Sequence, residues 1–521
     1  MKQQKALPIL LLLAALVMGA NTWGLDIYIL DEAKNASCAR EMWQRNDWIV
    51  PTFNGKLRTD KPPLHYYFMQ LGYTLFGATA FAARFFSVVC GILTVWLTYR
   101  FTRQELGETA AFWAGLGLVA SLQVAIQFHL ATPDPYLIFL LTLGQFLWFR
   151  GVTQERLGYL YVSYVVFGLG VLTKGPIAIV LPGLAFLLFL GVSGRLTWRG
   201  FLAVHPFRGL LVALLTAAPW YWAVGEATDG AWLRGFFLEH NLDRFSSPKE
   251  GHGGIFLITP LIFFVALLPF SIFLPQALRR VWQDRKQHEL LLFALSVVAV
   301  VVTFFSISST KLPSYPAPAF PFGAIILGYW IARQPRLKSL RISLWVWLVL
   351  SVLIVVGVAV GLRFDRSLSE LSWLAVYFAG LPLGAVLALF WILRRREVKK
   401  GLYALAGGML LTCFGFFYGA FPRADQENPV HVALEKMDPN RPFVAYKRFN
   451  PAFVFNLGDT VQKFEQIEAL RTYLQAHPEA YILAAKRHDE EVQQVGRLRE
   501  VVRQRDLFEI PTTVVWEYVP E

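Results

Sequence analysis

The sequence is poor in charged residues and in cysteine. Asp, Glu, Lys and Arg together make up 16% of the 521 residues, whereas hydrophobic residues make up 55%. A soluble protein of this length carries more charge and divides its apolar residues among several cores. The three cysteines (Cys38, Cys90 and Cys413) are scattered, which argues against a disulfide framework and against a metal site built from thiolates.

The sequence also lacks the internal repeat that many transporters show. Ionisable residues are rare in the middle of its apolar runs and collect at the outward ends of those runs. This distribution favours a site at the membrane surface over a conduction path through the membrane.

Long apolar runs are what the sequence has in abundance. Residues 290–307, 342–361 and 373–393, for example, approach the ~20 residues with which a helix crosses a bilayer. No water is available inside lipid to bond to free backbone groups, so such runs must form helices. The sequence predicts about thirteen membrane spans, at residues 7–29, 80–99, 110–128, 135–149, 158–173, 177–192, 209–225, 255–278, 290–308, 316–332, 342–362, 373–393 and 402–420.

Positive charge is distributed unevenly between the predicted loops. With the N-terminus placed in the cytoplasm, the inner segments carry 22 of the 49 Lys and Arg residues but only six acidic residues. This is the positive-inside pattern, so the net charge of +13 reports topology and not a nucleic-acid partner. An odd number of spans places the C-terminus outside. We expect the first span to be a retained anchor; the alternative is a signal peptide that ends at Ala20.

The character of the chain changes at Phe421-Pro422, where apolar runs shorten and charge rises. Residues 443–446, 480–485 and 512–518 are typical of short strands, and residues 463–476 are typical of an amphipathic helix. The pattern therefore indicates a small α/β unit after the last span.

We predict two domains from these boundaries. Residues 1–420 form a transmembrane domain, and residues 421–521 form an outer, periplasmic α/β domain. The first domain has two long outer loops, residues 31–79 and 226–254, which are rich in charged and aromatic side chains. Amphipathic helices are expected in the first of these loops.

A first polar cluster begins where span one meets the outer surface. It opens with Asp31-Glu32 and continues through Lys34. Asp31 stands at an expected helix N-cap, where the positive end of the helix favours an ionised carboxylate. Such a carboxylate suits a general base or a ligand of a sugar donor. The alternative is a simple cap on a solvated amphipathic helix.

A second polar cluster contains Arg58, Asp60 and Lys61 and is followed by Pro62-Pro63. The two prolines exclude an ordinary helix at this point and hold Lys61 at the membrane interface. A lysine there acts on a phosphate head group as a point charge. The alternative is a lysine whose side chain only reaches from the membrane to water.

Several elements follow one another between residues 31 and 67: Asp31-Glu32, Arg40-Glu41-Met42, Asn46-Asp47-Trp48, Pro51, Asn54-Gly55 and Asp60-Lys61-Pro62-Pro63-Leu64. In this order they resemble the first outer loop of the polyprenyl-phosphate-dependent glycosyltransferases of the protein O-mannosyltransferase superfamily. The best match is the lipid A aminoarabinose transferase branch. The resemblance implies a polytopic α-helical membrane protein with the GT-C fold.

Later elements of the chain resemble the same family. They are Thr132-Pro133-Asp134-Pro135, Leu172-Thr173-Lys174-Gly175-Pro176, the segment from Glu239-His240 to Arg244-Phe245, and Lys311-Leu312-Pro313 with Tyr315. The resemblance covers residues 1–420. Residues 421–521 match the family in position and size only.

The resemblance implies roles for the matching residues. Asp31 is the principal acidic residue and Asp134 a second one, while the donor phosphate is bound by Lys61, Lys34 and Arg58. The other site candidates are Glu32, Lys174, Glu239, Arg244, Lys311 and Tyr315. The residues alone are equally compatible with structural roles. Lys174 would then close a tight turn, and Lys311 and Tyr315 would anchor the chain at the membrane interface.

The resemblance also implies a divalent metal ion and excludes a nucleotide cofactor. Asp60 and His240 match a metal-coordinating pair for which the relatives usually have Glu and His. A hydrogen-bonded interfacial histidine is the alternative for His240.

An inverting glycosyltransferase of the inner membrane is the function that the resemblance implies. It would move a sugar, 4-amino-4-deoxy-L-arabinose or a related pentose or hexose, from a polyprenyl-phosphate donor to lipid A or another lipid or glycan acceptor. Transfer to protein Ser/Thr is the alternative within the family, and transport of a lipid-linked sugar is the alternative from another class. Membrane lipids are the other expected partners, and no oligomeric state is predicted.

Overall fold

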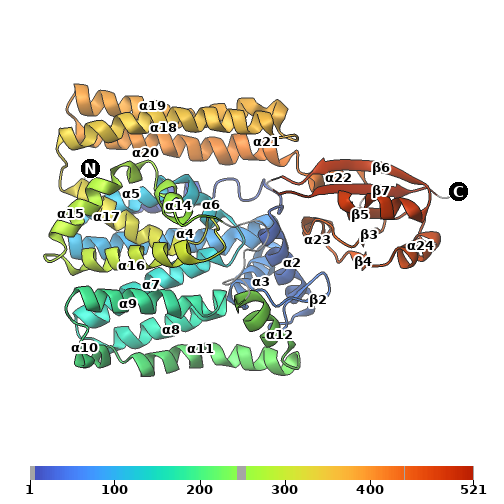
Figure 1. The fold of residues 1–521 in the computed structure, drawn as a ribbon, viewed down its shortest axis with the longest axis horizontal. Coiled ribbons are helices and arrows are strands. Elements are labelled where there is room, and N and C mark those ends of the chain that lie inside the picture. Colours follow the sequence, from blue (N-terminus) through green and yellow to red (C-terminus); the bar gives the residue numbers. More distant parts are fainter. Residues whose placement is uncertain (1–5, 243–253, 439, 508, 520–521) are drawn as a thin grey trace.

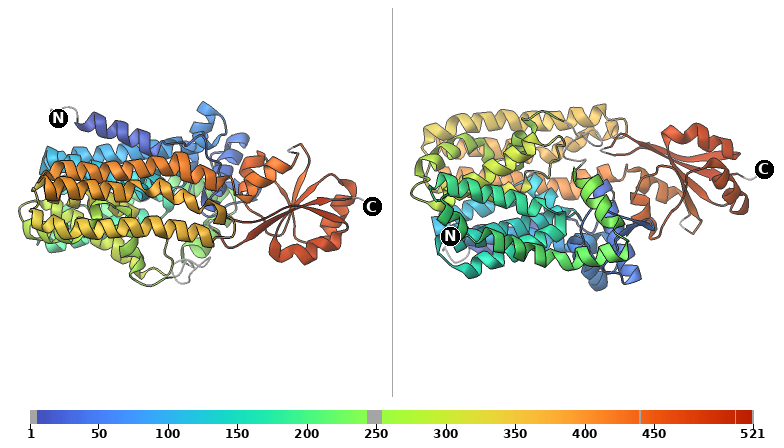
Figure 2. Two further views of the ribbon diagram at one scale, coloured as in Figure 1. Left: turned by 90° about the horizontal axis from the view of Figure 1, so that it is seen from above. Right: turned by 60° about the horizontal axis from the view of Figure 1, so that its bottom comes forward.

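The computed structural model describes residues 6–242, 254–438, 440–507 and 509–519, with the backbone alone for residues 239–242. Figure 1 shows a bundle of long helices that run along the longest axis of the molecule, with a smaller sheet domain at one end. The two further views in Figure 2 show the sheet domain projecting from that same end of the bundle.

Eight helical segments of the described chain are long and apolar enough to cross a membrane. Two bent pairs of helices each pass the same test when they are counted together, and three apolar helices are shorter. Each predicted span overlaps one of these segments. Because length and composition alone support eight to ten spans, the number thirteen stays a prediction, while the polytopic helical fold is confirmed.

The membrane part contains the following helices: α1 Ala6–Met18, α4 Ala80–Leu106, α5 Glu108–Val119, α6 Leu122–His129, α7 Asp134–Thr153, α8 Leu157–Lys174, α9 Ile177–Val192, α10 Trp198–Ala203, α11 Pro206–Ala227, α12 Ala231–Arg234, η2 Gly235–Leu242, α14 Ile258–Ala266, η3 Phe270–Phe273, α15 Leu274–Asp284, α16 Glu289–Ile307, η4 Ala317–Ala319, α17 Phe320–Ala332, α18 Leu337–Phe364, η5 Ser369–Phe378, α19 Gly380–Leu389, η6 Phe390–Arg394, α20 Val398–Gly415, η7 Phe416–Ala420 and α21 Phe421–Asp425. The last span continues through α21, so its helix ends beyond Phe421.

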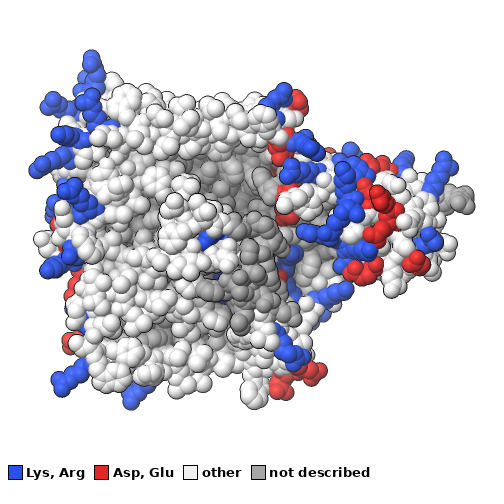
Figure 3. Space-filling view, viewed as in Figure 1, with Lys and Arg blue, Asp and Glu red and all other residues white. Residues whose placement is uncertain are grey.

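Charge is separated along the bundle. Figure 3 shows a broad uncharged belt over the helices, with Lys and Arg gathered at the end away from the sheet domain. Both signs of charge occur on and around the sheet domain. An uncharged belt between two charged ends is what a bundle that spans a membrane presents to lipid.

The first outer loop consists of two helices and a hairpin between them: α2 Leu30–Arg45, β1 Thr52–Phe53, β2 Lys56–Leu57 and α3 Leu64–Phe76. Asn54 and Gly55 form the two-residue turn of the hairpin with φ values of 53° and 71°, the left-handed backbone that such a turn requires. The carboxylate of Glu41 fixes this turn, since it accepts hydrogen bonds from the backbone N–H groups of Asn54 at 2.6 Å and Gly55 at 3.2 Å.

The sheet domain is built from α22 Pro429–Lys436, β3 Phe443–Tyr446, α23 Ala452–Leu457, β4 Gln462–Phe464, α24 Ile467–Ala476, β5 Tyr481–Ala485, η8 Lys486–His488, α25 Asp489–Val492, η9 Gln493–Val495, β6 Leu498–Arg505 and β7 Thr512–Tyr518. The strand order is β4-β3-β5-β7-β6. β3 pairs in parallel with β4 and β5, and β7 pairs antiparallel with β5 and β6.

The strands predicted at residues 443–446, 480–485 and 512–518 are confirmed as β3, β5 and β7. The predicted start of the helix at Lys463 is wrong, because residues 462–464 pair with β3 as the edge strand β4 and the helix begins at Ile467. Strand β6 was not predicted. Its side chains are mostly charged and partly exposed, so it lacks the apolar signal of a buried strand.

The sheet domain is fastened to the first outer loop by polar contacts. The guanidinium of Arg40 on α2 donates hydrogen bonds of 2.8 Å to the backbone carbonyls of Val454 and Phe455. The side-chain amide of Asn54 donates to the carbonyl of Val461 at 2.9 Å and accepts from its N–H at 2.7 Å. Two elements that the sequence analysis singled out in this loop, Arg40-Glu41-Met42 and Asn54-Gly55, therefore hold the hairpin and the domain in place.

Candidate active site

Two cavities lie at the end of the bundle that carries the sheet domain. We call the smaller one, of about 160 Å³, the edge pocket; among its lining residues are Asp60, Lys61, Asp134, Lys174, Phe236, Phe305, Ser308 and Tyr315. We call the larger one, of about 600 Å³, the junction cavity, because outer loop one and the sheet domain line it together. Asp60 lines both cavities.

The edge pocket collects predicted site residues from four distant segments. Asp60 and Lys61 precede α3, Asp134 is the first residue of α7, Lys174 is the last residue of α8, and Tyr315 follows α16. Each lies at a helix end, where the backbone stops or starts at the outer edge of the bundle. Charged groups of both signs therefore meet at one point beside apolar walls.

Proline and glycine set these positions locally. Pro63 is the N-cap of α3, so Lys61 lies in the short non-helical segment just before the helix. Gly175 ends α8 with a φ of 81°, and a Cβ at this residue would come within 2.7 Å of the ring of Phe236. Only glycine fits here, so the Lys174-Gly175 turn is required to place the lysine in the pocket.

Lys174 and Asp134 form an ion pair across the edge pocket. The ammonium of Lys174 also lies over the ring of Tyr315, 5.7 Å from its centroid. Asp31 lines neither of the two cavities. A group of cations held among carboxylates suits a phosphate that changes charge during a reaction.

Asp31 is exposed in the first turn of α2. The predicted N-cap at this residue is wrong: the helix begins at Leu30, and Ile29 is its cap. The first turn still carries the positive end of the helix, which favours a charged carboxylate. Leu30 and Lys34, next to Asp31 and one turn after it, line the junction cavity.

Arg58 is buried and held from three sides. Its guanidinium donates to the Asn35 amide oxygen at 3.1 Å and the Tyr66 hydroxyl at 3.2 Å, and lies 3.4 Å from the Asp60 carboxylate. Burial alone lowers the pKa of Arg58, but the charges of Tyr66 and Asp60 raise it above its ordinary value. Arg58 is therefore a fixed positive charge in the wall of the junction cavity.

His65, at the start of α3, is an uncharged neighbour of this cluster. Burial, with the positive charges of Arg58 and Lys61, holds the pKa of His65 well below its usual value. Its Nε2 lies 3.5 Å from the Asn35 amide oxygen that Arg58 also contacts. The sequence analysis did not single out His65 or Asn35; the short spacing to Arg58 and Lys61 was the available signal.

Glu32 contacts a different set of groups from the other site candidates. Its two carboxylate oxygens accept bonds of 2.8 and 2.9 Å from the guanidinium of Arg84 on α4, and one of them also accepts from the N–H of Ala131. Both side chains of the ion pair are almost fully buried. Glu32 therefore joins outer loop one to the bundle.

Lys311 caps the end of a helix. Its ammonium donates hydrogen bonds to the backbone carbonyls of Phe305, Ser306 and Ser308, at or just after the end of α16. These carbonyls have no partner inside the helix, so the lysine supplies one. Tyr315 packs on the ring of Phe305 at 4.6 Å and lines the edge pocket, whereas the amine of Lys311 is occupied by the helix end.

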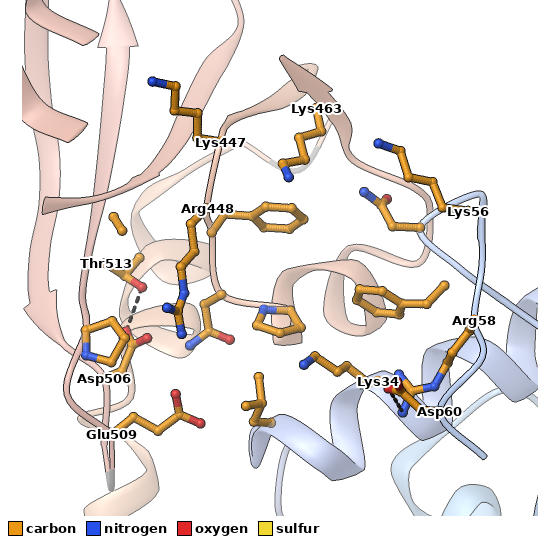
Figure 4. Close-up of a pocket in the computed structure, with 18 of the residues that line it drawn as sticks. Lys34, Lys56, Arg58, Asp60, Lys447, Arg448, Lys463, Asp506, Glu509 and Thr513 are labelled. Carbon is orange, nitrogen blue, oxygen red and sulfur yellow. Dashed lines mark hydrogen bonds and ion pairs between the residues drawn. The ribbon is translucent and has the colours of Figure 1, made fainter. Parts of the chain in front are cut away.

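One wall of the junction cavity comes from outer loop one and the opposite wall comes from the sheet domain. Figure 4 shows Lys34, Lys56 and Arg58 on the loop side and Lys447, Arg448 and Lys463 on the domain side. Asp506 and Glu509 stand at one end. The sequence analysis found no functional motif in residues 421–521, so the domain-side cations are new members of the site region.

Some predicted residues cannot be placed. The side chains of Glu239 and His240 and all of Arg244 lie outside the described residues, so the predicted Asp60–His240 metal pair is not tested. Among the described side chains, no group of three or more His, Cys, Asp or Glu residues could hold a metal ion. Asp60 itself lies beside Arg58, a poor neighbour for a cation, and we derive no chemical step through a metal.

The chain is similar to known membrane glycosyltransferases in sequence and in fold. The model of the dolichyl-phosphate-mannose-protein mannosyltransferase family matches residues 60–222. The undecaprenyl phosphate-alpha-4-amino-4-deoxy-L-arabinose arabinosyl transferase of Pseudomonas aeruginosa (strain UCBPP-PA14) is 32% identical over 324 residues, 60% of this chain and 57% of that protein. The crystal structure of ArnT from Cupriavidus metallidurans bound to undecaprenyl phosphate matches with a TM-score of 0.80 and 21% identity, over 99% of both chains.

In sequence and in fold, the chain is similar to GT-C glycosyltransferases. It lies close to the aminoarabinose transferase branch, which confirms the predicted resemblance and fold class. A protein of Aquifex aeolicus (strain VF5) is also similar, with 27% identity over 428 residues that cover 81% of this chain and 80% of that protein. The match to the Pseudomonas enzyme spans less than two thirds of that enzyme's length.

Both cavities lie at the end of the bundle that carries the sheet domain, because helix ends and the segment between α1 and α4 contribute to their linings. The site residues lie on loops and helix ends supported by packed helices, where catalytic groups are commonly found.

Proposed function

We propose that this GT-C protein is an inverting glycosyltransferase that moves a sugar from a polyprenyl-phosphate carrier to lipid A or another lipid or glycan acceptor. The sugar is 4-amino-4-deoxy-L-arabinose or a related pentose or hexose. The observation that carries the proposal is the edge pocket, where Asp60, Lys61, Asp134 and Lys174 converge beside Tyr315. Two lysines at the mouth of a pocket in the outer edge of a membrane bundle suit a phosphate whose lipid tail stays in the bilayer.

The leaving group of the reaction is the carrier phosphate. As the bond between the anomeric carbon and the phosphate oxygen breaks, its electron pair stays on that oxygen and adds a negative charge. Lys61 and Lys174 stabilise this developing charge, with Lys34 and Arg58 on the side of the junction cavity. Attack by the acceptor oxygen from the opposite face forms the new bond and inverts the anomeric carbon.

The role of Asp31 depends on the acceptor. A hydroxyl acceptor must lose its proton, and Asp31 then takes it as general base. A phosphate acceptor is already anionic: the donor diester and the acceptor monoester exchange the sugar, and no proton moves. In that case Asp31 binds the amine of the donor sugar.

The proposal includes a topology for the chain in the bacterial inner membrane. The N-terminus lies in the cytoplasm with the basic end of the bundle, and the sheet domain lies in the periplasm with both cavities. Reporter fusions at Lys436 and in the Lys399-Lys400 segment test it. A periplasmic signal at the second position contradicts this topology.

The test of the function is transfer by purified full-length protein in proteoliposomes. The substrates are undecaprenyl-phosphate-linked aminoarabinose and lipid A, and mass spectrometry detects the product. We expect Asp31→Asn and Lys61→Ala to lower kcat/KM by about 100-fold or more. Asp229→Asn and Lys436→Ala are the matched controls, because both residues are exposed and line neither cavity.

Three results would change the proposal. Full activity of well-folded Asp31→Asn and Lys61→Ala proteins contradicts the site. Movement of the donor across the bilayer without covalent transfer identifies a transporter, and transfer to Ser/Thr peptides identifies a protein glycosyltransferase. Activity lost on chelation with EDTA and restored by Mg²⁺ or Mn²⁺ would instead support the divalent ion that the family resemblance implies.

A further inference from the structure

The junction cavity carries a surplus of positive charge. Its lining contains six cationic side chains and three carboxylates: Lys34, Lys56, Arg58, Lys447, Arg448 and Lys463 against Asp60, Asp506 and Glu509. Two of the carboxylates are engaged, since Asp60 faces Arg58 and Asp506 accepts a hydrogen bond from Thr513 at 2.6 Å. Burial raises the pKa of Asp506 to about 6, which reduces its negative charge in mildly acidic conditions.

The cations that the sheet domain contributes lie on or directly after strands of the sheet. Lys447 and Arg448 directly follow β3, and Lys463 lies on the neighbouring strand β4. Backbone hydrogen bonds fix both residues after the strand, from Lys447 N–H to the Phe464 carbonyl and from Ala485 N–H to the Arg448 carbonyl, each 2.9 Å long. Figure 4 shows the side chains of Arg448 and Lys463 directed towards the other lining residues, whereas the amine of Lys447 points outward.

Two of these cations have acidic neighbours that an incoming anion can replace. Lys447 pairs with Glu491, and Lys463 pairs with Glu465 at 2.7 Å. Each of the four side chains is at least 30% exposed, and ion pairs so exposed to water contribute little to stability. A phosphate that bridges the lysines therefore displaces them at low cost.

The junction cavity adjoins the edge pocket. Asp60 lines both, and the next residue, Lys61, lines the edge pocket. A donor whose phosphate lies at Lys61 presents its sugar at the boundary of the two spaces. The cavity of about 600 Å³ on the other side of that boundary is large enough for a substrate head group.

We propose that the junction cavity is the acceptor subsite and that Lys447, Arg448 and Lys463 of the sheet domain hold an anionic group of the acceptor. The group is a phosphate or carboxylate, carried by a lipid or by a soluble glycan. This inference rests on the proposed glycosyl transfer and deepens it, because it assigns the sheet domain a function in acceptor choice.

The test separates acceptor binding from donor binding. Arg448→Ala and Lys463→Ala are assayed in proteoliposomes beside Lys436→Ala, a cation of the same domain that lies outside the cavity. We expect each cavity variant to raise the acceptor KM about tenfold, the effect of one charge-assisted hydrogen bond, with the donor KM within about twofold of wild type. Arg448→Lys should restore most of the affinity, and thermal unfolding of each variant controls for misfolding.

The acceptor's anionic group is tested with two matched lipids, lipid A with both of its phosphates and lipid A from which only the phosphate that does not receive the sugar has been removed. The effect of the variants should disappear on the partly dephosphorylated lipid. Competition by inorganic phosphate or by a water-soluble phosphorylated glucosamine disaccharide then tells whether the head group alone is recognised or the lipid is also required.

Two outcomes overturn the inference without touching the proposed function. One is wild-type transfer with an unchanged acceptor KM in both cavity variants. The other is an increase in acceptor KM that is the same for both lipids. Absence of transfer by the wild-type protein to any acceptor instead contradicts the proposed function itself.

Discussion

The edge pocket and the junction cavity differ in where their walls come from. Helix ends and loops of the membrane part line the edge pocket, and its charged residues stand in elements that resemble the family. The sheet domain supplies about half of the junction cavity, from a region in which the sequence analysis found no element that resembles the family. The pocket with the family elements suits a chemical step shared by many enzymes, and the cavity without them suits the choice of an acceptor.

The two cavities also differ in how their charges are balanced. In the edge pocket, Lys174 is paired with Asp134, so positive and negative groups are held at fixed positions. In the junction cavity, cations outnumber carboxylates, and two of the cations have exposed partners. A balanced, preorganised pocket suits a transition state, whereas an excess of one sign suits the recognition of a charged substrate.

Loss of a cation should therefore have different kinetic effects in the two cavities. Lys174→Ala removes a charge beside the leaving phosphate, and we expect kcat to fall about 100-fold. The acceptor KM should change little, in contrast with Arg448→Ala. Steady-state kinetics with each substrate varied in turn measures both quantities, and Lys174→Arg is the control for charge. If Lys174→Ala changed only the acceptor KM and left kcat unchanged, the proposed difference between the two cavities would be wrong.

Loss of Glu32 should change stability and not chemistry, although Glu32 directly follows Asp31. In Glu32→Gln the guanidinium of Arg84 stays buried without its carboxylate, which costs about 3–5 kcal/mol of folding free energy. Thermal unfolding in detergent and the yield of folded protein measure the loss. Glu370→Gln, which removes the partner of an exposed ion pair with Arg363, is the control and should be nearly neutral. A folded, normally stable but inactive Glu32→Gln protein would place Glu32 in the catalytic machinery.

The attachment of the sheet domain should depend on Arg40. Arg40→Ala leaves the carbonyls of Val454 and Phe455 without their donors, and we expect the contact between the domain and α2 to weaken by about 2–3 kcal/mol. Hydrogen exchange at residues 452–461 should then be faster, with the helices of the bundle unchanged. Arg471→Ala on the exposed side of α24 serves for comparison. If residues 452–461 were equally protected from hydrogen exchange in both variants, other contacts would be sufficient to hold the sheet domain against α2.

The smallest effect is expected from the buried carboxyl in the junction cavity. The pKa of Asp506 rises on folding from 3.8 to about 6, so the folded state favours the neutral acid. The resulting stabilisation is complete below pH 3.8 and is lost as the pH rises through about 6. At pH 8, the free energy of unfolding of Asp506→Asn should therefore exceed that of wild type by about 1–2 kcal/mol. Near pH 4, the two proteins should be about equally stable. A constant difference across this range would exclude Asp506 as the titrating group.

Sequence patterns predicted the frame of the molecule and part of the site. Apolar runs located the helices, and alternation located β3, β5 and β7. Lys61, Asp134 and Lys174 lie together, as their family elements suggested. A short polar element does not reveal where its side chains point, however. Glu32 and Lys311 were therefore grouped with the site, although Glu32 contacts Arg84 and Lys311 contacts a helix end.

The junction cavity was beyond the reach of the sequence for a different reason. Its two halves are nearly 400 residues apart in the chain, and only the docking of the sheet domain brings Lys34 near Arg448. The one local signal was the pair Lys447-Arg448 directly after a predicted strand. A basic pair at a strand end is common on protein surfaces and points to a ligand only when a second charged wall faces it.

The hairpin turn at Asn54-Gly55 joins these two regions mechanically. Val461 of the sheet domain is hydrogen-bonded to Asn54, and Glu41 on α2 accepts hydrogen bonds from the same turn. Arg58 follows Gly55 by only three residues. Arg58 in turn contacts Asp60, the residue common to both cavities. A tilt of the sheet domain would therefore also shift this turn and the residues that follow it, up to Asp60 and Lys61 where the two cavities meet.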